Sequence, residues 1–206
     1  MALRLIGTAT TDNNGVAVLS NGYTGTGAGE IDVVAKTEID DRIFQSEPYT
    51  VWDTIAYDDG TNTNWSGGAN LTKTSDNGVV TLKTSNANSS TGKIYLTNDL
   101  TGDFEALIEA KLNQAYTNSY AVTIGYMNGT SLSNMLLTTT DWTYFKLKRV
   151  NGVYTGYYST DNTNWTELTF TSDNAGTGTV KFFIMIYNAT GTEYGMNYKN
   201  LKIYSI

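Results

Sequence analysis

The sequence predicts an all-β protein built as a β-sandwich, and three observations favour this fold class. Short runs of β-branched and aromatic residues recur along the 206 residues, and glycine or asparagine stands between nearly all of them. The clearest periodicity is the two-residue alternation of a half-buried strand. Proline occurs once, only 16% of the residues are charged, and no segment has a convincing helical pattern.

Composition also limits the functions open to this chain. Cysteine and histidine are absent, which excludes disulfides, thiol proteases and Ser-His-Asp triads. A net charge of −7 argues against nucleic acid or an anionic membrane as the partner. No stretch has the roughly 18 apolar residues of a membrane-spanning helix, so membrane insertion is not expected.

Taken in order, residues 1–52 form a first section of short strands. Residues 3–17 have the pattern of a strand, a glycine-containing turn and a second strand. Residues 23–29 are a glycine-rich connection, and residues 30–35 and 49–52 alternate as further strands. About four strands cannot close a seven-stranded sandwich, and their apolar alternation implies a face that needs a cover. We therefore expect this section to pack against the rest of the chain or against copies of itself, as a homo-oligomer.

The second section, residues 53–206, continues with short strands. Residues 104–112 alternate most clearly, with Phe104 and Ile108 on the apolar side and Glu105 and Glu109 on the other. Further strands are expected at residues 78–83, 93–96, 120–126, 133–138, 179–187 and 198–204.

Residues 142–170 predict three strands joined by two tight turns. The strands are expected at residues 142–150, 153–159 and 165–170. Asn151-Gly152 supplies the positive-φ pair of a type I′ hairpin turn. Asp161 begins a polar turn in which its side chain can accept hydrogen bonds from the backbone that follows. Such a meander needs a larger sheet with a buried face.

This meander carries the motif Asn-Gly-x-Tyr-x-x-Tyr-Tyr-Ser-Thr-Asp-x-x-x-Trp at residues 151–165. The motif resembles the late hairpin of concanavalin A-like jelly-roll domains, in particular the laminin-G-like and carbohydrate-binding group. Tyr57-Asp58-Asp59-Gly60 and Asn200-Leu201-Lys202-Ile203-Tyr204 resemble the first and last strands of such domains. The resemblance implies a concanavalin A-like jelly-roll β-sandwich for residues 53–206, an architecture shared by lectins, adhesion modules and glycosidases.

The first section carries a second resemblance. Gly-Thr-Ala-Thr-Thr-Asp-x-x-Gly-Val-Ala at residues 7–17 and Thr-Gly-Thr-Gly-Ala-Gly at residues 24–29 resemble the second half of a bacterial immunoglobulin-like repeat. Such repeats recur in prokaryotic surface adhesins. The resemblance implies a partial immunoglobulin-like section at residues 1–52, without the first strands of the repeat.

Two patterns of acidic residues bear on whether the chain is a glycosidase. Jelly-roll glucanases carry a Glu-x-Asp-x-(x)-Glu strand that puts a retaining pair of acids on one face. Glu30 and Asp32 lack the last acid, and Leu107 replaces the middle acid between Glu105 and Glu109. We expect both patterns to be solvated strand faces and the protein not to be an enzyme.

Any bound metal must have oxygen ligands, so calcium is the candidate cofactor. Asp58 and Asp59, with Asn197 or Asn200 in the last strand, resemble the structural calcium site of several β-sandwich carbohydrate-binding modules. Such a site would tie the ends of the domain together. The alternative is that these residues serve as ordinary turn and cap residues.

The aromatic residues are the remaining functional signal, because sugar rings stack on aromatic rings and tyrosine hydroxyls pair with sugar hydroxyls. Trp65 and Trp165 are expected to be structural. The candidate ligand-binding residues are Tyr116, Tyr120, Trp142, Tyr157, Tyr158, Tyr187 and Tyr194. For each of them, cross-strand packing is the competing interpretation.

Together these features predict a non-enzymatic adhesion or receptor-binding module that binds cell-surface glycan. The expected setting is extracellular, on a prokaryotic cell surface or on a virion fibre, where a trimer would fit. A jelly-roll glycosidase and a structural spacer without a ligand are the two alternatives.

Overall fold

The computed structural model describes residues 31–33, 36–39, 42–45, 49–51, 54–58, 60, 64–84, 90–173, 175–176, 178–189 and 193–206. Every regular element within these ranges is a β-strand, so the all-β prediction is confirmed for this part of the chain. The same residues form no helix that could cross a membrane.

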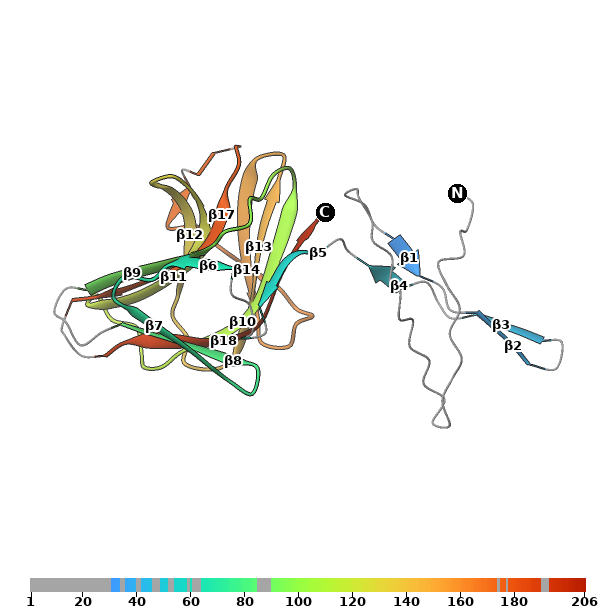
Figure 1. Cartoon of the computed structure of the whole chain (residues 1–206), viewed down its shortest axis with the longest axis horizontal. Coiled ribbons are helices and arrows are strands. Elements are labelled where there is room, and N and C mark those ends of the chain that lie inside the picture. Colours follow the sequence, from blue (N-terminus) through green and yellow to red (C-terminus); the bar gives the residue numbers. More distant parts are fainter. Residues whose placement is uncertain are drawn as a thin grey trace.

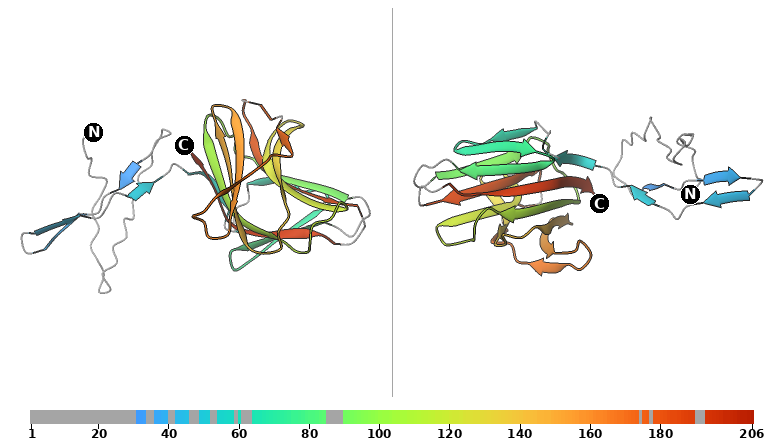
Figure 2. Two further views of the ribbon diagram at one scale, coloured as in Figure 1. Left: turned by 180° about the vertical axis from the view of Figure 1, so that it is seen from behind. Right: turned by 90° about the horizontal axis from the view of Figure 1, so that it is seen from below.

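Two antiparallel sheets form the body of the molecule (Figures 1 and 2). The eight-stranded sheet has the order β15-β14-β13-β10-β18-β8-β7, with β5 also paired to β18. Its strands are β5 (Thr54–Asp58), β7 (Leu71–Asp76), β8 (Val79–Thr84), β10 (Phe104–Leu112), β13 (Thr143–Val150), β14 (Val153–Ser159), β15 (Thr166–Leu168) and β18 (Gly195–Ser205).

The six-stranded sheet has the order β16-β12-β11-β17-β9-β6. Its strands are β6 (Trp65–Gly67), β9 (Ser90–Leu96), β11 (Tyr120–Asn128), β12 (Ser131–Leu137), β16 (Ser172–Asp173) and β17 (Lys181–Asn188). The expected strands of residues 53–206 are thus all present in the two sheets. Three strands were not expected, namely β6, β7 and β16, whereas β5 ends in the Tyr57-Asp58 segment that resembles the start of such domains.

The hydrophobic core lies between the two sheets. On β10, Phe104, Ala106 and Ile108 are fully buried, as their alternation predicted. The facing sheet contributes Ile124 and Ile184, which are also fully buried, together with further alternate residues of β11 and β17. Because each strand buries every second side chain, the other side chains of the eight-stranded sheet form a separate outer face.

The β13–β14 hairpin confirms the predicted turn chemistry. Asn151 and Gly152 have φ angles of 51° and 78°, the left-handed conformations that a type I′ turn requires. In the next turn, Asp161 accepts hydrogen bonds from the backbone N–H groups of Thr163 and Asn164. The bonds from Asn164, followed by those from Thr163 and Ser159, hold the pKa of Asp161 well below its usual range.

In the first section, two antiparallel pairs are described. β1 (Ile31–Val33) pairs with β4 (Tyr49–Val51), and β2 (Lys36–Ile39) pairs with β3 (Arg42–Gln45). β1 and β4 lie within the strands expected at residues 30–35 and 49–52, whereas the β2–β3 hairpin was not expected. The motifs that resemble an immunoglobulin-like repeat lie outside the described residues, so that resemblance, the packing of this section and the homo-oligomer remain predictions.

Candidate functional site

The outer face of the eight-stranded sheet, the side turned away from the core, carries rows of polar and aromatic side chains. On β10 these are Glu105, Leu107, Glu109 and Lys111, which alternate with the buried residues. Strand register extends each of them into a row across the sheet, because paired residues of antiparallel neighbours share a face. Residues far apart in sequence therefore meet on this face.

The first row contains Glu105, Lys148 and Tyr204, which are register partners on β10, β13 and β18. The carboxylate of Glu105 lies 3.1 Å from the ammonium of Lys148 and accepts a hydrogen bond from the hydroxyl of Tyr204 at 3.4 Å. Burial, with the nearby Glu105 carboxylate as the second cause, raises the pKa of Tyr204 to about 12.

A similar arrangement surrounds Glu109. Its carboxylate lies 2.9 Å from the ammonium of Lys199 and accepts a hydrogen bond from the amide of Asn200 at 3.5 Å. Glu105 and Glu109 are only 9% and 7% exposed, so the expectation that they form a solvated strand face is wrong. The long side chains of the neighbouring strands cover both carboxylates.

This geometry bears on the glycosidase alternative. Leu107 separates Glu105 from Glu109 on the outer face, and each carboxylate is held by its own lysine. A retaining pair needs two carboxyl groups about 5–5.5 Å apart, one of them free to attack the sugar. The arrangement of Glu105 and Glu109 is that of two structural ion pairs.

Next to the ion pair of Glu109 and Lys199, two lysines lie against the ring of Trp142. The ammonium of Lys199 lies 4.6 Å from the centroid of the Trp142 ring, and that of Lys111 lies 5.2 Å from it. These are cation–π distances, at which the negative face of the ring attracts an ammonium group. Trp142, one of the predicted ligand-binding residues, is half-buried.

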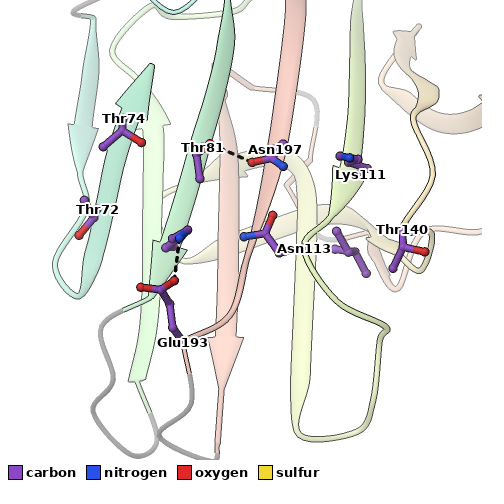
Figure 3. A pocket seen from close by; sticks show the side chains of 10 residues that line it. Thr72, Thr74, Thr81, Lys111, Asn113, Thr140, Glu193 and Asn197 are labelled. Atoms are coloured by element: carbon purple, nitrogen blue, oxygen red, sulfur yellow. Dashed lines mark hydrogen bonds and ion pairs between the residues drawn. The ribbon is translucent and has the colours of Figure 1, made fainter. Parts of the chain in front are cut away.

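A cavity of about 730 Å³ adjoins this cluster on the outer face. Its lining comes from β7, β8, β10, β18 and nearby loops, and includes Thr74, Thr81, Lys83, Lys111, Glu193 and Asn197. Figure 3 shows Thr74, Thr81, Asn197 and Lys111 on neighbouring strands, with Glu193 just before β18.

Two contacts fix polar groups in the cavity wall. The hydroxyl of Thr81 donates to the side-chain oxygen of Asn197 at 2.9 Å, which leaves the Asn197 amide hydrogens available to another acceptor. The ammonium of Lys83 lies 2.7 Å from the carboxylate of Glu193. The wall thus offers hydroxyl, amide and ammonium donors to a polar ligand.

Of the other predicted aromatics, only Tyr157 shares this face with Trp142. Tyr157 is the register partner of Lys146, and the ammonium of Lys146 lies 4.0 Å from the centroid of the Trp165 ring. Tyr158 is exposed on the opposite side of β14, as strand alternation requires.

A second group of predicted aromatics lies elsewhere. Tyr120 and Tyr194 stack with their ring centroids 4.7 Å apart, and Tyr194 is only 1% exposed. Burial, then the nearby Tyr116 and Tyr120, raises the pKa of Tyr194 to about 12. Tyr187 is exposed on the outer face of the six-stranded sheet. The structure therefore divides the seven candidates among several surfaces.

The predicted calcium ligands are also separated. The Asp58 carboxylate is fully buried on the core side, where it accepts hydrogen bonds from Gly60, Trp65 and Tyr198 and pairs with Lys73 at 3.2 Å.

Asn200, by contrast, bonds Glu109 on the outer face, and Asp59 lies outside the described residues. Within the described ranges, no group of three acidic residues could hold a metal ion. A cation at Asp58 would compete with the ammonium of Lys73.

Sequence reasoning did not single out Lys111 or Lys199 as site residues. The available signal was the alternation of Lys111 with the buried residues of β10, which puts it on the outer face. Nothing in the sequence indicates that Lys199 reaches the same tryptophan ring, because that depends on β18 lying beside β10.

Comparisons with known proteins support the fold. No protein-family model matches the chain, and no curated protein matches it. A solved structure from work on endo-acting O-glycanases of the human gut microbiota has a TM-score of 0.54 at 8% identity, covering 75% of this chain and 100% of that one. A β-1,3-glucanase from Mycobacterium marinum has a TM-score of 0.51 at 7% identity, covering 74% and 99%.

The VIP36 exoplasmic/lumenal domain bound to Ca²⁺ and Man3GlcNAc is a weaker match. Its TM-score is 0.47 at 11% identity, covering 69% of this chain and 83% of that one. At such identities the first two structures show the fold alone, which is a concanavalin A-like jelly-roll sandwich.

Proposed function

We propose that this protein is a non-enzymatic glycan-binding module whose site is the cavity on the outer face together with Trp142. The observation that carries the proposal is the composition of this cavity. Threonine hydroxyls, asparagine amides and lysine ammonium groups line it, and the ammonium of one lining residue, Lys111, lies 5.2 Å from the centroid of the half-buried Trp142 ring. Sugars present many hydroxyls on a ring with apolar C–H faces, and this lining offers a counterpart to both features.

The lining also argues against an apolar ligand. Small-molecule pockets are mostly lined by hydrophobic side chains. Here, Leu112 is the one aliphatic side chain among the ten residues of the cavity lining. A flexible, hydroxyl-rich chain can replace its hydrogen bonds to water with hydrogen bonds to protein donors. It therefore fits such a surface better than a compact apolar molecule.

The non-enzymatic part of the proposal rests on Glu105 and Glu109. Both carboxylates are paired with lysines, and Leu107 stands between them in place of the middle acid of the glucanase pattern. Incubation with mixed-linkage glucan, laminarin, xylan and mucin O-glycans should release no reducing sugar. Turnover that is lost in Glu105→Gln or Glu109→Gln would establish the glycosidase alternative instead.

The proposed setting follows the sequence resemblance. Repeats similar to residues 7–29 occur in surface adhesins, and a sandwich attached to such a repeat would present its outer face to a neighbouring cell or host. We therefore propose an extracellular adhesion role, on a cell surface or a virion fibre.

A glycan array probed with the full chain tests the binding function. We expect binding that Asn197→Ala weakens by about tenfold, since a hydrogen-bonding group in the site is lost. Asn128→Ala, the same change on the six-stranded sheet, is the control and should bind normally. An array without any signal would favour the structural-spacer alternative.

A further inference from the structure

The outer face of the eight-stranded sheet is rich in lysine, although the protein carries a net charge of −7. The chain has 13 basic residues, and among those that the structure describes six point from this face. They are Lys83, Lys111, Lys146, Lys148, Lys199 and Lys202. A local excess of one charge sign on a protein of the other sign is a feature of a surface that attracts charged ligands.

Three of these lysines are neutralised by acids of the same face or its border. Lys83 pairs with Glu193, Lys148 with Glu105 and Lys199 with Glu109. Lys111, Lys146 and Lys202 have no ion pair within the described part of the chain. Two further acids lie on this face, both exposed on edge strands. Glu167 on β15 is the register partner of Tyr157, and Asp76 on β7 is the register partner of Val79.

At Trp142, two ammonium groups lie over one ring, those of Lys111 and Lys199. Only one of them, that of Lys199, has a carboxylate beside it. The ammonium of Lys111 therefore keeps its charge uncompensated by a carboxylate. Because Lys111 also lines the cavity, its side chain borders the space that the ligand would occupy.

A neutral glycan does not need such an ammonium group. A carboxylate or sulfate ester would accept a charge-assisted hydrogen bond from it, and these bonds are about twice as strong as neutral ones. Contact with the Trp142 ring would restrict the Lys111 side chain before the ligand binds, which reduces the conformational entropy lost on binding.

We propose that the ligand of this site is an acidic glycan, and that Lys111, positioned by Trp142, binds its carboxylate or sulfate group. This inference rests on the glycan-binding function proposed above. What assigns the acidic class to the ligand is Lys111 at the cavity wall.

The test uses an array in which each acidic glycan is paired with its neutral counterpart. The pairs are sialylated and unsialylated lactosamine, chondroitin sulfate and desulfated chondroitin, and polygalacturonate and its carboxyl-reduced form. We expect binding to the acidic members, weakened by at least about tenfold in Lys111→Gln and kept in Lys111→Arg. Lys93→Gln, which removes a lysine from the six-stranded sheet, is the matched control.

Raising the salt concentration from 50 to 300 mM should weaken wild-type binding several-fold and Lys111→Gln binding less, because salt screens exposed charges. Binding retained by Trp142→Leu at wild-type strength would overturn the positioning role of the tryptophan. Equal binding to acidic and neutral members, unaffected by Lys111→Gln, would overturn the acidic ligand but keep the glycan-binding function. No binding to any member would overturn both proposals.

Discussion

The hydroxyl of Tyr198 donates a hydrogen bond of 2.7 Å to the carboxylate of Asp58, 140 residues away. The bond joins β18 to the end of β5, so it ties the last strand of the sandwich to its first. The same carboxylate receives the Trp65 indole N–H at 2.6 Å and the Gly60 backbone N–H at 2.7 Å. Gly60 has a φ of 97°, a conformation that glycine adopts without strain.

Tyr198→Phe should therefore destabilise the protein. The change removes a hydrogen bond to a buried charged group, for which about 1.5–3 kcal/mol is typical. Urea denaturation followed by tryptophan fluorescence would give the free energy of unfolding.

Tyr194→Phe is the matched control. The Tyr194 hydroxyl is buried and finds no hydrogen-bond partner among the described residues, so its removal should cost little or even stabilise. Equal losses in the two variants would show that the bond to Asp58 contributes nothing specific.

The carboxylate of Asp58 already has hydrogen-bond donors and an ion-pair partner, which leads to a prediction about calcium. The ammonium of Lys73 lies 3.2 Å from it and supplies the positive charge that a buried carboxylate needs. EDTA should then leave the melting temperature unchanged. A fall of several degrees, reversed by added Ca²⁺ but not by Mg²⁺, would instead support the calcium site that the sequence suggested.

The sequence predicted individual strands better than it predicted which strands pair with one another. The strand at residues 104–112 has the predicted bounds, because its alternation is strict and one face is wholly apolar. β7 was not expected, since Leu71 is the only apolar residue among its six and the other five are polar or charged. A strand with two largely polar faces lacks the period on which such predictions depend.

The site was less predictable than the fold because it depends on which strands become neighbours. Alternation puts Lys111 on the outer face, but only the pairing of β10 with β18 brings Lys199 to the same ring. Likewise, composition made the tyrosines candidates, whereas burial of Tyr194 depends on tertiary packing. Contacts between distant strands are set by topology, which residue patterns do not encode locally.

Raised tyrosine pKa values predict a loss of stability at alkaline pH. The pKa values of Tyr194 and Tyr204 are raised from 10.0 to about 12 in the folded state, chiefly by burial. Their contribution to the free energy of unfolding is present below pH 10 and is lost between pH 10 and 12. Over this range the unfolded chain has already released the two protons while the folded protein still holds them. Melting temperatures measured from pH 9 to 12 should fall less steeply for the Tyr194→Phe, Tyr204→Phe double variant than for the wild type.

Arg149 is a buried cation held by backbone carbonyls. It is 1% exposed and has no carboxylate partner among the described residues. Its guanidinium donates to the carbonyl oxygens of Gly102 and Gly178, at 2.8 Å from Nε and 2.6 Å from one terminal nitrogen. Its central carbon lies 4.4 Å from the centroid of the Phe104 ring. One side chain thereby connects the loop before β10 to the loop before β17.

Arg149→Lys should destabilise the protein by about 3 kcal/mol even though the charge is kept. A lysine has a single nitrogen and cannot reach both carbonyls, so one buried acceptor loses its partner and the stacking on Phe104 is weakened. The melting temperature should fall by about 6–12 °C, as measured by calorimetry. Lys202→Met, on an exposed side chain of β18, is the control and should change stability by less than about 0.5 kcal/mol. Wild-type stability in Arg149→Lys would mean that charge alone, and not the planar geometry of the guanidinium group, holds the two loops together.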